Sequence, residues 1–230
     1  MSATLSVEGL TAGYRGAIAV RDVDLEVGEG EVVCLLGRNG AGKTTVLRAL
    51  MGLLPRRGSV RLGGTDVTSW RGSRIKAAGM AWVPQDQQVV AGLTVSEHFS
   101  LVDPRADARA LVAEAAELFP VLGERARQDA ATLSGGERKM LGIALALAAQ
   151  PSVILMDEPT EGVAPVIVEG LVAAIGDVVE RAAVLLVEQN LDTALALGER
   201  AYVLETGSIV EDDRLAELSA SGRLERRLAL

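Results

Sequence analysis

The chain has 230 residues, 49% of them hydrophobic and 23% charged, with a formal net charge of −8 at pH 7. This length and balance exclude a disordered chain and predict one well-buried domain. The acidic surplus argues against nucleic acid as a partner and against adsorption onto an anionic membrane by charge alone, because both attract basic proteins.

Short runs of β-branched and aliphatic residues dominate the first third of the chain. Strands are predicted at TLSVEGL (4–10), VDLEV (23–27) and EVVCLLG (31–37). A glycine-rich loop then opens an amphipathic helix over residues 42–54, which Pro55 ends. Two more strands are predicted over residues 58–64 and 80–83, and Pro84 stops the second.

The composition changes between residues 93 and 149, where alanine, leucine and glutamate recur at helical spacing and predict an all-helical insertion. After it, strands are predicted at 152–157, 182–188 and 200–205, alternating with helices near 165–180 and 191–198 and at the C-terminus. Because VVCLLG, VILMD and VLLVE are apolar up to their last residue, they indicate a parallel sheet covered on both faces. The basic segment RLERRLAL (223–230) is expected to be a solvated helix end.

Residues 37–44 (GRNGAGKT) match the pattern of a phosphate-binding P-loop. Glycines let backbone N–H groups turn toward an anion, and the following helix adds the positive end of its dipole. The Lys43 ammonium suits the β- and γ-phosphates of ATP, and the Thr44 hydroxyl suits Mg²⁺. The expected ATP-binding residues of this segment are Gly37, Arg38, Asn39, Gly40, Ala41, Gly42, Lys43, Thr44 and Thr45.

A pair of acids ends the apolar segment VILMDE. Four apolar residues before Asp157 place its carboxylate at the carboxyl edge of the predicted sheet, where α/β proteins bind ligands. We expect Asp157 to hold Mg²⁺ through water and Glu158 to take a proton from an attacking water. Taken alone, the two acids could equally cap a strand before the turn at Pro159.

Ser134, Gly135 and Gly136 open a long apolar helix in TLSGGERKMLGIALAL. Ser134 suits the N-cap position. The three residues repeat the chemistry of the P-loop, because backbone amides at a helix start can bind an anion. One chain is therefore predicted to carry two phosphate-binding half-sites, separated by a helical block.

Together these segments resemble the ATP-binding subunits of ABC transporters, with GRNGAGKT similar to Walker A, VILMDE to Walker B and LSGGE to the signature motif. The resemblance covers nearly the whole chain. It implies an α/β fold: a P-loop NTPase, RecA-like core (about residues 1–86 and 151–230) with an N-terminal antiparallel β portion and an inserted all-α subdomain (about residues 87–150). It also implies two units packed head to tail, the signature of one closing on ATP held by the other.

Three further residues take their predicted roles from this resemblance. Tyr14, in AGYRG, matches the aromatic residue that stacks on adenine. Gln85, in WVPQDQ, matches the glutamine that meets Mg²⁺ and senses the membrane partner, and a short permease helix is expected in the groove beside it. His98, the single histidine, matches a surface or interface position rather than a catalytic one.

Gln189, in VLLVEQN, holds the position where most members carry a histidine that contacts the γ-phosphate. A glutamine amide can donate a hydrogen bond but cannot carry charge or pass a proton. We expect a catalytic set of Glu158, Lys43 and Gln189, slower than a partner site that has histidine. The alternative is that Gln189 merely caps a strand.

Three segments are similar to one of the two ATPases of branched-chain amino acid importers and their amide- or urea-type relatives: VEQN, EPTEGVAP with its Ala164, and LFPVLGERARQDAATLSGGE. This likeness implies transmembrane permease subunits, a second ATPase subunit in a heterodimer or homodimer, and indirectly a solute-binding protein as partners. The chain is then expected to be cytosolic and held at the inner membrane face by the permease. A lone cysteine, Cys34, in a predicted buried strand fits a reducing compartment, and the N-terminus lacks a signal-peptide pattern.

Two alternatives stay open from the sequence. One is an ABC ATPase outside transport, although a single ATPase unit without long coiled coils fits the translation and repair types poorly. The other is a regulatory module that binds ATP and hardly hydrolyses it. Glu158 argues against such a module, and Gln189 keeps it open.

Overall fold

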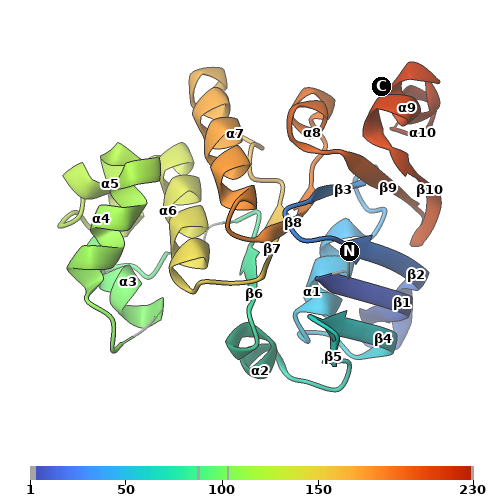
Figure 1. The fold of residues 1–230 in the computed structure, drawn as a ribbon, viewed down its shortest axis with the longest axis horizontal. Coiled ribbons are helices and arrows are strands. Elements are labelled where there is room, and N and C mark those ends of the chain that lie inside the picture. Colours follow the sequence, from blue (N-terminus) through green and yellow to red (C-terminus); the bar gives the residue numbers. More distant parts are fainter. Residues whose placement is uncertain (1–3, 87–88, 103, 229–230) are drawn as a thin grey trace.

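Two sheets with surrounding helices make up the fold (Figure 1), in a computed structural model that describes residues 4–86, 89–102 and 104–228. In spatial order the larger sheet contains β10 (Ser208–Arg214), β9 (Arg200–Glu205), β3 (Val32–Leu36), β8 (Ala183–Val187), β7 (Val153–Asp157) and β6 (Met80–Val83). Neighbouring strands are parallel from β9 to β6, and β10 pairs with β9 in the antiparallel sense. The predicted parallel α/β sheet is confirmed.

The smaller sheet is antiparallel and comes from the N-terminal part of the chain. In spatial order it contains β2 (Ala17–Val27), β1 (Leu5–Tyr14), β4 (Arg56–Leu62) and β5 (Thr65–Asp66). Leu5 and Val7 of β1 are buried while Glu8 is exposed, because successive strand side chains point to opposite faces. This sheet is the N-terminal antiparallel portion that the family resemblance implies.

Helices connect the strands and fill the middle of the chain. They are α1 (Lys43–Leu50), α2 (Gly72–Ala77), α3 (Val95–Val102), α4 (Ala108–Leu118), α5 (Pro120–Glu124), a 3₁₀ turn (Ala130–Thr132), α6 (Gly135–Ala148), α7 (Pro165–Val179), α8 (Leu191–Leu197), α9 (Leu215–Ala220) and α10 (Arg223–Leu228). Helix α1 ends earlier than predicted because Gly52 turns the chain with φ of 65° and the Leu53 N–H bonds to the Arg48 carbonyl.

Three short elements, α2, β5 and β10, were not predicted from the sequence. Helix α2 buries one residue, Ile75, so it carries no periodic apolar signal. Strand β10 contains Glu211, Asp212 and Asp213 and lies at the sheet edge. It pairs with β9 through a tight turn in which Thr206 and Gly207 both have positive φ, 47° and 87°.

The central strands β3, β7 and β8 of the larger sheet are buried on both faces, and their alternate residues enter two different cores. Cys34 and Leu36 of β3 pack in the cluster that includes residues of α6 and α7. Val33 and Leu35 pack in the cluster that includes α1 and the antiparallel sheet. Helices α1 and α6, which carry the predicted P-loop and signature segments, therefore cover opposite faces of the sheet.

The helical block and the C-terminus join the same core as α6. Phe99 of α3, Leu122 of α5 and Leu224 of α10 are each 0% exposed and belong to this one cluster. The expectation of a solvated C-terminal helix end holds for residues 225–227 of α10, which are exposed, and fails for Leu224, which is buried. Arg223 anchors the helix through ion pairs of 3.1 Å with Glu211 and 2.5 Å with Asp213. Residues 229–230 lie outside the described ranges.

The division into a core and a helical subdomain stays a prediction, and its proposed boundary at residue 87 also falls outside the described residues. Within the ranges described, no helix combines the length and apolar character required to cross a bilayer.

Candidate nucleotide-binding site

The predicted P-loop connects the carboxyl end of β3 to the start of α1. Gly42 is the helix N-cap, with φ of 112°, and a Cβ there would lie 2.7 Å from Cγ1 of Val20. A Cβ on Gly37 would lie 2.4 Å from the Leu204 carbonyl oxygen. Close packing against β2 and β9 therefore requires glycine at both positions, and it leaves the first-turn amides of α1 without a capping side chain.

Lys43 is the first residue of α1, and its side chain is 5% exposed. Its Nζ donates to the carbonyl oxygens of Gly37 at 2.7 Å and Arg38 at 3.4 Å, and it lies 3.4 Å from Oε1 of Glu158. The ammonium group thus lies folded over the loop, between the backbone that would hold phosphate and the candidate base.

Thr44 and Asp157 form the candidate metal position. The Thr44 hydroxyl donates to Oδ1 of Asp157 at 3.3 Å, which joins the start of α1 to the end of β7. Burial raises the pKa of Asp157 to about 6, although the hydrogen bond from Thr44 and the charge of Lys43 oppose the rise. A nearby cation would favour the ionised form.

This donor set fits Mg²⁺. The described residues contain no group of three or more His, Cys, Asp or Glu side chains that could hold a metal ion. A fully proteinaceous cage is not needed, because Mg²⁺ keeps several waters and takes one or two protein oxygens together with substrate phosphates. One hydroxyl and one carboxylate beside the predicted phosphate-binding loop meet that requirement.

Glu158 lies at the centre of a cluster of predicted residues. It is 5% exposed, its φ is 50°, and its N–H donates to the Val187 carbonyl at 2.9 Å. Its Oε1 accepts from Nε2 of Gln189 at 2.7 Å, and its Oε2 accepts from Nε2 of Gln85 at 3.2 Å. The structure therefore brings Gln85, Gln189 and Lys43 together around one carboxylate.

Gln189 reaches across to the P-loop as well. Its Nε2 donates to Oδ1 of Asn39 at 2.6 Å, so a single amide connects the tip of β8, the loop after β3 and Glu158. Gln85 also donates to Glu161. Its amide faces Glu158 and Glu161, and its predicted contact with Mg²⁺ stays a prediction.

The predicted signature residues lie away from this cluster, on the other face of the sheet. The Ser134 hydroxyl caps α6 by accepting from the Glu137 N–H at 3.3 Å, and Glu137 accepts from the Ser134 N–H at 2.7 Å. Ser134 and Gly135 are exposed, while Gly136 is buried, with its Cβ position 3.1 Å from Ile167. The predicted N-cap is confirmed, and phosphate binding there stays a prediction.

Tyr14 and His98 occupy different environments. The Tyr14 side chain is 40% exposed, and its hydroxyl accepts from Arg48 of α1 at 3.2 Å, so it lies beside the P-loop helix. The sequence predicts a surface or interface position for His98; the surface alternative is wrong, and the interface alternative stays a prediction. The residue is 5% exposed, its Nε2 accepts from the Val90 N–H at 2.9 Å, and its Nδ1 lies 2.8 Å from the Thr94 carbonyl oxygen, as in the neutral Nδ1–H tautomer.

Two buried charged residues next to the cluster escaped sequence analysis. Oε1 of Glu188 accepts from the N–H and hydroxyl of Thr160 at 3.1 and 2.8 Å, and Oε2 accepts from the Gln189 N–H at 3.1 Å. Nζ of Lys139, on α6, donates to the Glu158 carbonyl oxygen at 2.7 Å. Glu188 carried a signal, as an acid directly after an apolar strand, whereas Lys139 carried none.

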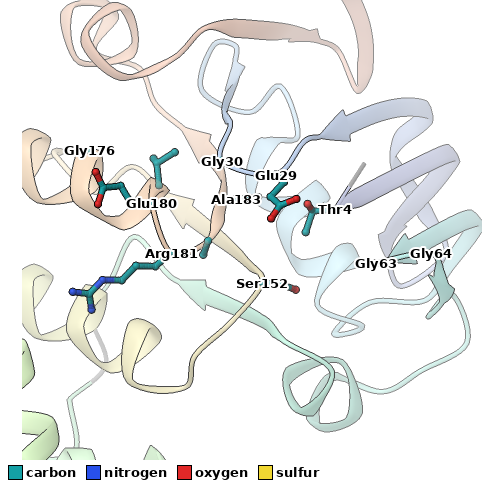
Figure 2. A pocket seen from close by; sticks show the side chains of 12 residues that line it. Thr4, Glu29, Gly30, Gly63, Gly64, Ser152, Gly176, Glu180, Arg181 and Ala183 are labelled. Atoms are coloured by element: carbon teal, nitrogen blue, oxygen red, sulfur yellow. The ribbon is translucent and has the colours of Figure 1, made fainter. Parts of the chain in front are cut away.

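Two grooves lie away from the phosphate loop. One, of 700 Å³, is lined by Thr4, Ser152 and Arg181 at the amino-terminal edge of β7 and β8, opposite the site (Figure 2). The other, of 580 Å³, lies among α2, β6, α3 and α6 and is lined by Trp82, His98 and other mostly apolar residues. The exposed side chains Leu53, Val90 and Leu101 also line it.

Comparisons with known proteins agree on one family. The ABC transporter profile matches residues 20–161. The chain is 40% identical over 219 residues to the high-affinity branched-chain amino acid transport ATP-binding protein BraG of Pseudomonas aeruginosa, covering 93% of this chain and 94% of that protein. It is 33% identical over 231 residues to the lipopolysaccharide export system ATP-binding protein LptB of Escherichia coli, covering 97% and 96%.

Solved structures show the same fold. A nucleotide-free ATP-binding cassette from an ABC transporter superimposes with a TM-score of 0.89, covering 100% of this chain and 99% of that chain at 23% identity.

Proposed function

Because the chain belongs to the family of ABC transporter ATP-binding proteins, which hydrolyse ATP, we propose that it powers an importer of branched-chain amino acids or related small polar solutes. The 40% identity to BraG over nearly the whole of both chains supports this solute class. The 33% identity to LptB makes an export subunit the second candidate.

The observation that carries the ATPase function is the convergence on Glu158. Lys43, Gln85 and Gln189 all reach this carboxylate, one residue beyond Asp157 at the carboxyl edge of the sheet. In the proposed mechanism a water attacks the γ-phosphorus in line with the leaving oxygen, and Glu158 takes its proton. Lys43 and the amides at the start of α1 hold the phosphate oxygens.

Thr44 and Asp157 would hold Mg²⁺, with Gln85 as a further ligand. When bound, the ion neutralises charge on the β- and γ-phosphates. The hydroxyl and carboxylate already lie side by side, 3.3 Å apart, which supports this assignment. Tyr14 would stack on adenine, and its place beside α1 supports that role.

Gln189 would donate to the γ-phosphate with the Nε2 that now bonds to Glu158 and Asn39. Because the amide stays neutral, we propose that this site turns over more slowly than one with histidine. A second ATPase subunit would supply the signature that closes this site, and Ser134, Gly135 and Gly136 would close the partner's.

The 580 Å³ groove is the proposed seat for a short helix of a transmembrane permease subunit. Its exposed Leu53, Val90 and Leu101 suit an apolar helix face. Trp82 lines it too, and among the described residues its buried indole N–H has no acceptor. Contact here would hold the chain at the cytoplasmic face of the membrane, with a solute-binding protein acting from the far side.

The test of the catalytic assignment compares ATP turnover of wild type, Glu158→Gln, Gln189→His and Gln189→Ala, with nucleotide binding measured in parallel. We expect Glu158→Gln to bind ATP and to lose at least about 10²-fold in kcat. Gln189→His should raise kcat, and Gln189→Ala should lower it. Turnover that survives Glu158→Gln would remove the proposed base, and an inert Gln189→Ala would leave Gln189 as a strand cap.

The test of the solute class is uptake of labelled leucine by cells that lack this chain. Wild type should restore uptake and Glu158→Gln should not. Unchanged leucine uptake together with a defect in the outer-membrane lipid layer would favour the export subunit instead.

A further inference from the structure

Lys139 is a buried cation for which the proposed chemistry has no use. It lies in the second turn of α6 and is 8% exposed. Its Nζ donates to the carbonyl oxygen of Glu158 at 2.7 Å. Burial lowers the pKa of Lys139, and the carboxylates of Glu161, Glu188, Glu158 and Asp86 oppose this shift. The buried positive charge of Lys139 is therefore compensated by the acidic side chains around it.

The group that Lys139 contacts is a strained part of the backbone. Glu158 has φ of 50°, a left-handed conformation that side chains other than glycine and asparagine rarely adopt. Surrounding contacts must hold such a residue in place. Here the Glu158 N–H is held by Val187 of β8 at 2.9 Å, and its carbonyl is held by Lys139 of α6.

The next residues of this loop are held from the sheet side. Glu188, 2% exposed, accepts from both the N–H and the hydroxyl of Thr160. The Glu161 N–H closes the turn onto the Glu158 carbonyl at 3.2 Å. Among these contacts to the loop, the one from Lys139 comes from α6, the helix that also carries Ser134, Gly135 and Gly136.

We propose that Lys139 is a positioning residue that couples the two half-sites of one subunit. It would transmit movement of the signature end of α6 to the backbone of Glu158. The proposal rests on the proposed function, in which the start of α6 meets ATP held by a partner subunit. Lys139 lies five positions after Ser134 on the same helix, so a displacement at the signature also displaces Nζ and the carbonyl that it holds.

The substitution that tests the proposal is Lys139→Met, which keeps the length of the side chain and removes its charge and donors. Lys139→Arg keeps both, and Arg109→Met is the control, an exposed cation at the start of α4 in the same helical block. We expect Lys139→Met to lower kcat by about 10- to 100-fold, because small misplacement of a catalytic group is costly. The Kd for ATP and the KM should change less than about twofold.

Lys139→Arg should recover at least a third of the wild-type kcat, and Arg109→Met should match wild type. The proposal is overturned if Lys139→Met turns over like wild type, or if kcat and ATP affinity fall together with a general loss of stability that arginine does not rescue.

A second measurement does not depend on turnover. Native-state hydrogen exchange of the amides of residue 158, Thr160 and Glu161 is followed in the full chain carrying Glu158→Gln, with and without ATP. We expect ATP to slow exchange in this segment, and we expect the addition of Lys139→Met to abolish that slowing while ATP still binds. Equal slowing with and without Lys139→Met would overturn the coupling role. If wild type does not hydrolyse ATP, the proposed function fails separately, and the exchange experiment still decides the role of Lys139.

Discussion

Replacing Asp157 by asparagine should make the nucleotide-free protein more stable while removing its dependence on Mg²⁺. The carboxyl group is 1% exposed, and burial raises its pKa from 3.8 to about 6. A raised carboxyl pKa means that the folded protein binds the proton more tightly than the unfolded chain does. The resulting stabilisation is complete below the unfolded pKa and disappears as the pH rises through the folded pKa.

The magnitude follows from the two pKa values. The rise of the pKa from 3.8 to about 6 corresponds to a penalty of about 3 kcal/mol at pH 7.5. At pH 4.5 the penalty falls to about 1 kcal/mol, because the folded protein then holds the carboxyl protonated and only the cost of protonating a group that is mostly ionised in the unfolded chain remains. Asparagine has the same shape, carries no charge, and keeps an oxygen to accept from Thr44. We therefore expect Asp157→Asn to raise the free energy of unfolding by up to about 3 kcal/mol at pH 7.5, with a smaller gain at pH 4.5.

Urea unfolding at the two pH values measures this difference, and Asp177→Asn, at an exposed acid on α7, is the matched control. Titration with ATP, with and without Mg²⁺, measures the functional loss: Mg²⁺ should strengthen ATP binding to wild type and not to the variant. A variant that is less stable than wild type at pH 7.5, or a gain that is the same at both pH values, would refute the assignment of buried charge strain to Asp157.

Three further changes have definite expected outcomes. Gly42→Ala forces a Cβ to within 2.7 Å of Val20 at a φ of 112°, so ATP affinity should fall at least about tenfold by equilibrium titration; unchanged affinity would contradict the tight packing of the loop. Cys34 is 0% exposed and burial raises its pKa to about 12, so iodoacetamide at pH 8.5 should leave the native thiol unmodified and should label it after unfolding, as mass spectrometry can show. Leu224→Ala should cost about 2–5 kcal/mol in urea unfolding if α10 folds with the core, whereas a near-zero cost would restore the picture of a solvated C-terminal end.

Local patterns in the chain were enough to place the predicted phosphate loop, the acid pair and the main strands in the fold. Gly37 to Thr44 and Asp157-Glu158 are contiguous, so their chemistry and their place at a strand end can be inferred without knowing any distant contact. The run VILM before Asp157 is apolar at every position because both faces of the sheet are covered, and burial confirms this cover for β3, β7 and β8.

Long-range pairing explains what the sequence left out or misplaced. Strand β10 is half polar because it lies at an edge, and a short edge strand has no apolar signature. His98 and α10 look polar along the chain. His98 is nevertheless buried, with both ring nitrogens bonded to backbone groups, and Arg223 of α10 forms ion pairs with acids of β10.

Long-range contacts also explain why the sequence did not reveal the roles of Lys139 and Glu188. In the sequence, a lysine in the second turn of a helix and an acid at a strand end are ordinary residues. The fold brings both to the loop of residues 158–160: Lys139 contacts a residue 19 positions away, and Glu188 contacts one 28 positions away. A site formed by contiguous residues can be predicted from the sequence, because its geometry depends on local structure alone. A contact between a helix and a distant loop forms only when the helices pack on the two faces of the sheet. Such a contact, as between Lys139 and Glu158, cannot be predicted from the sequence alone.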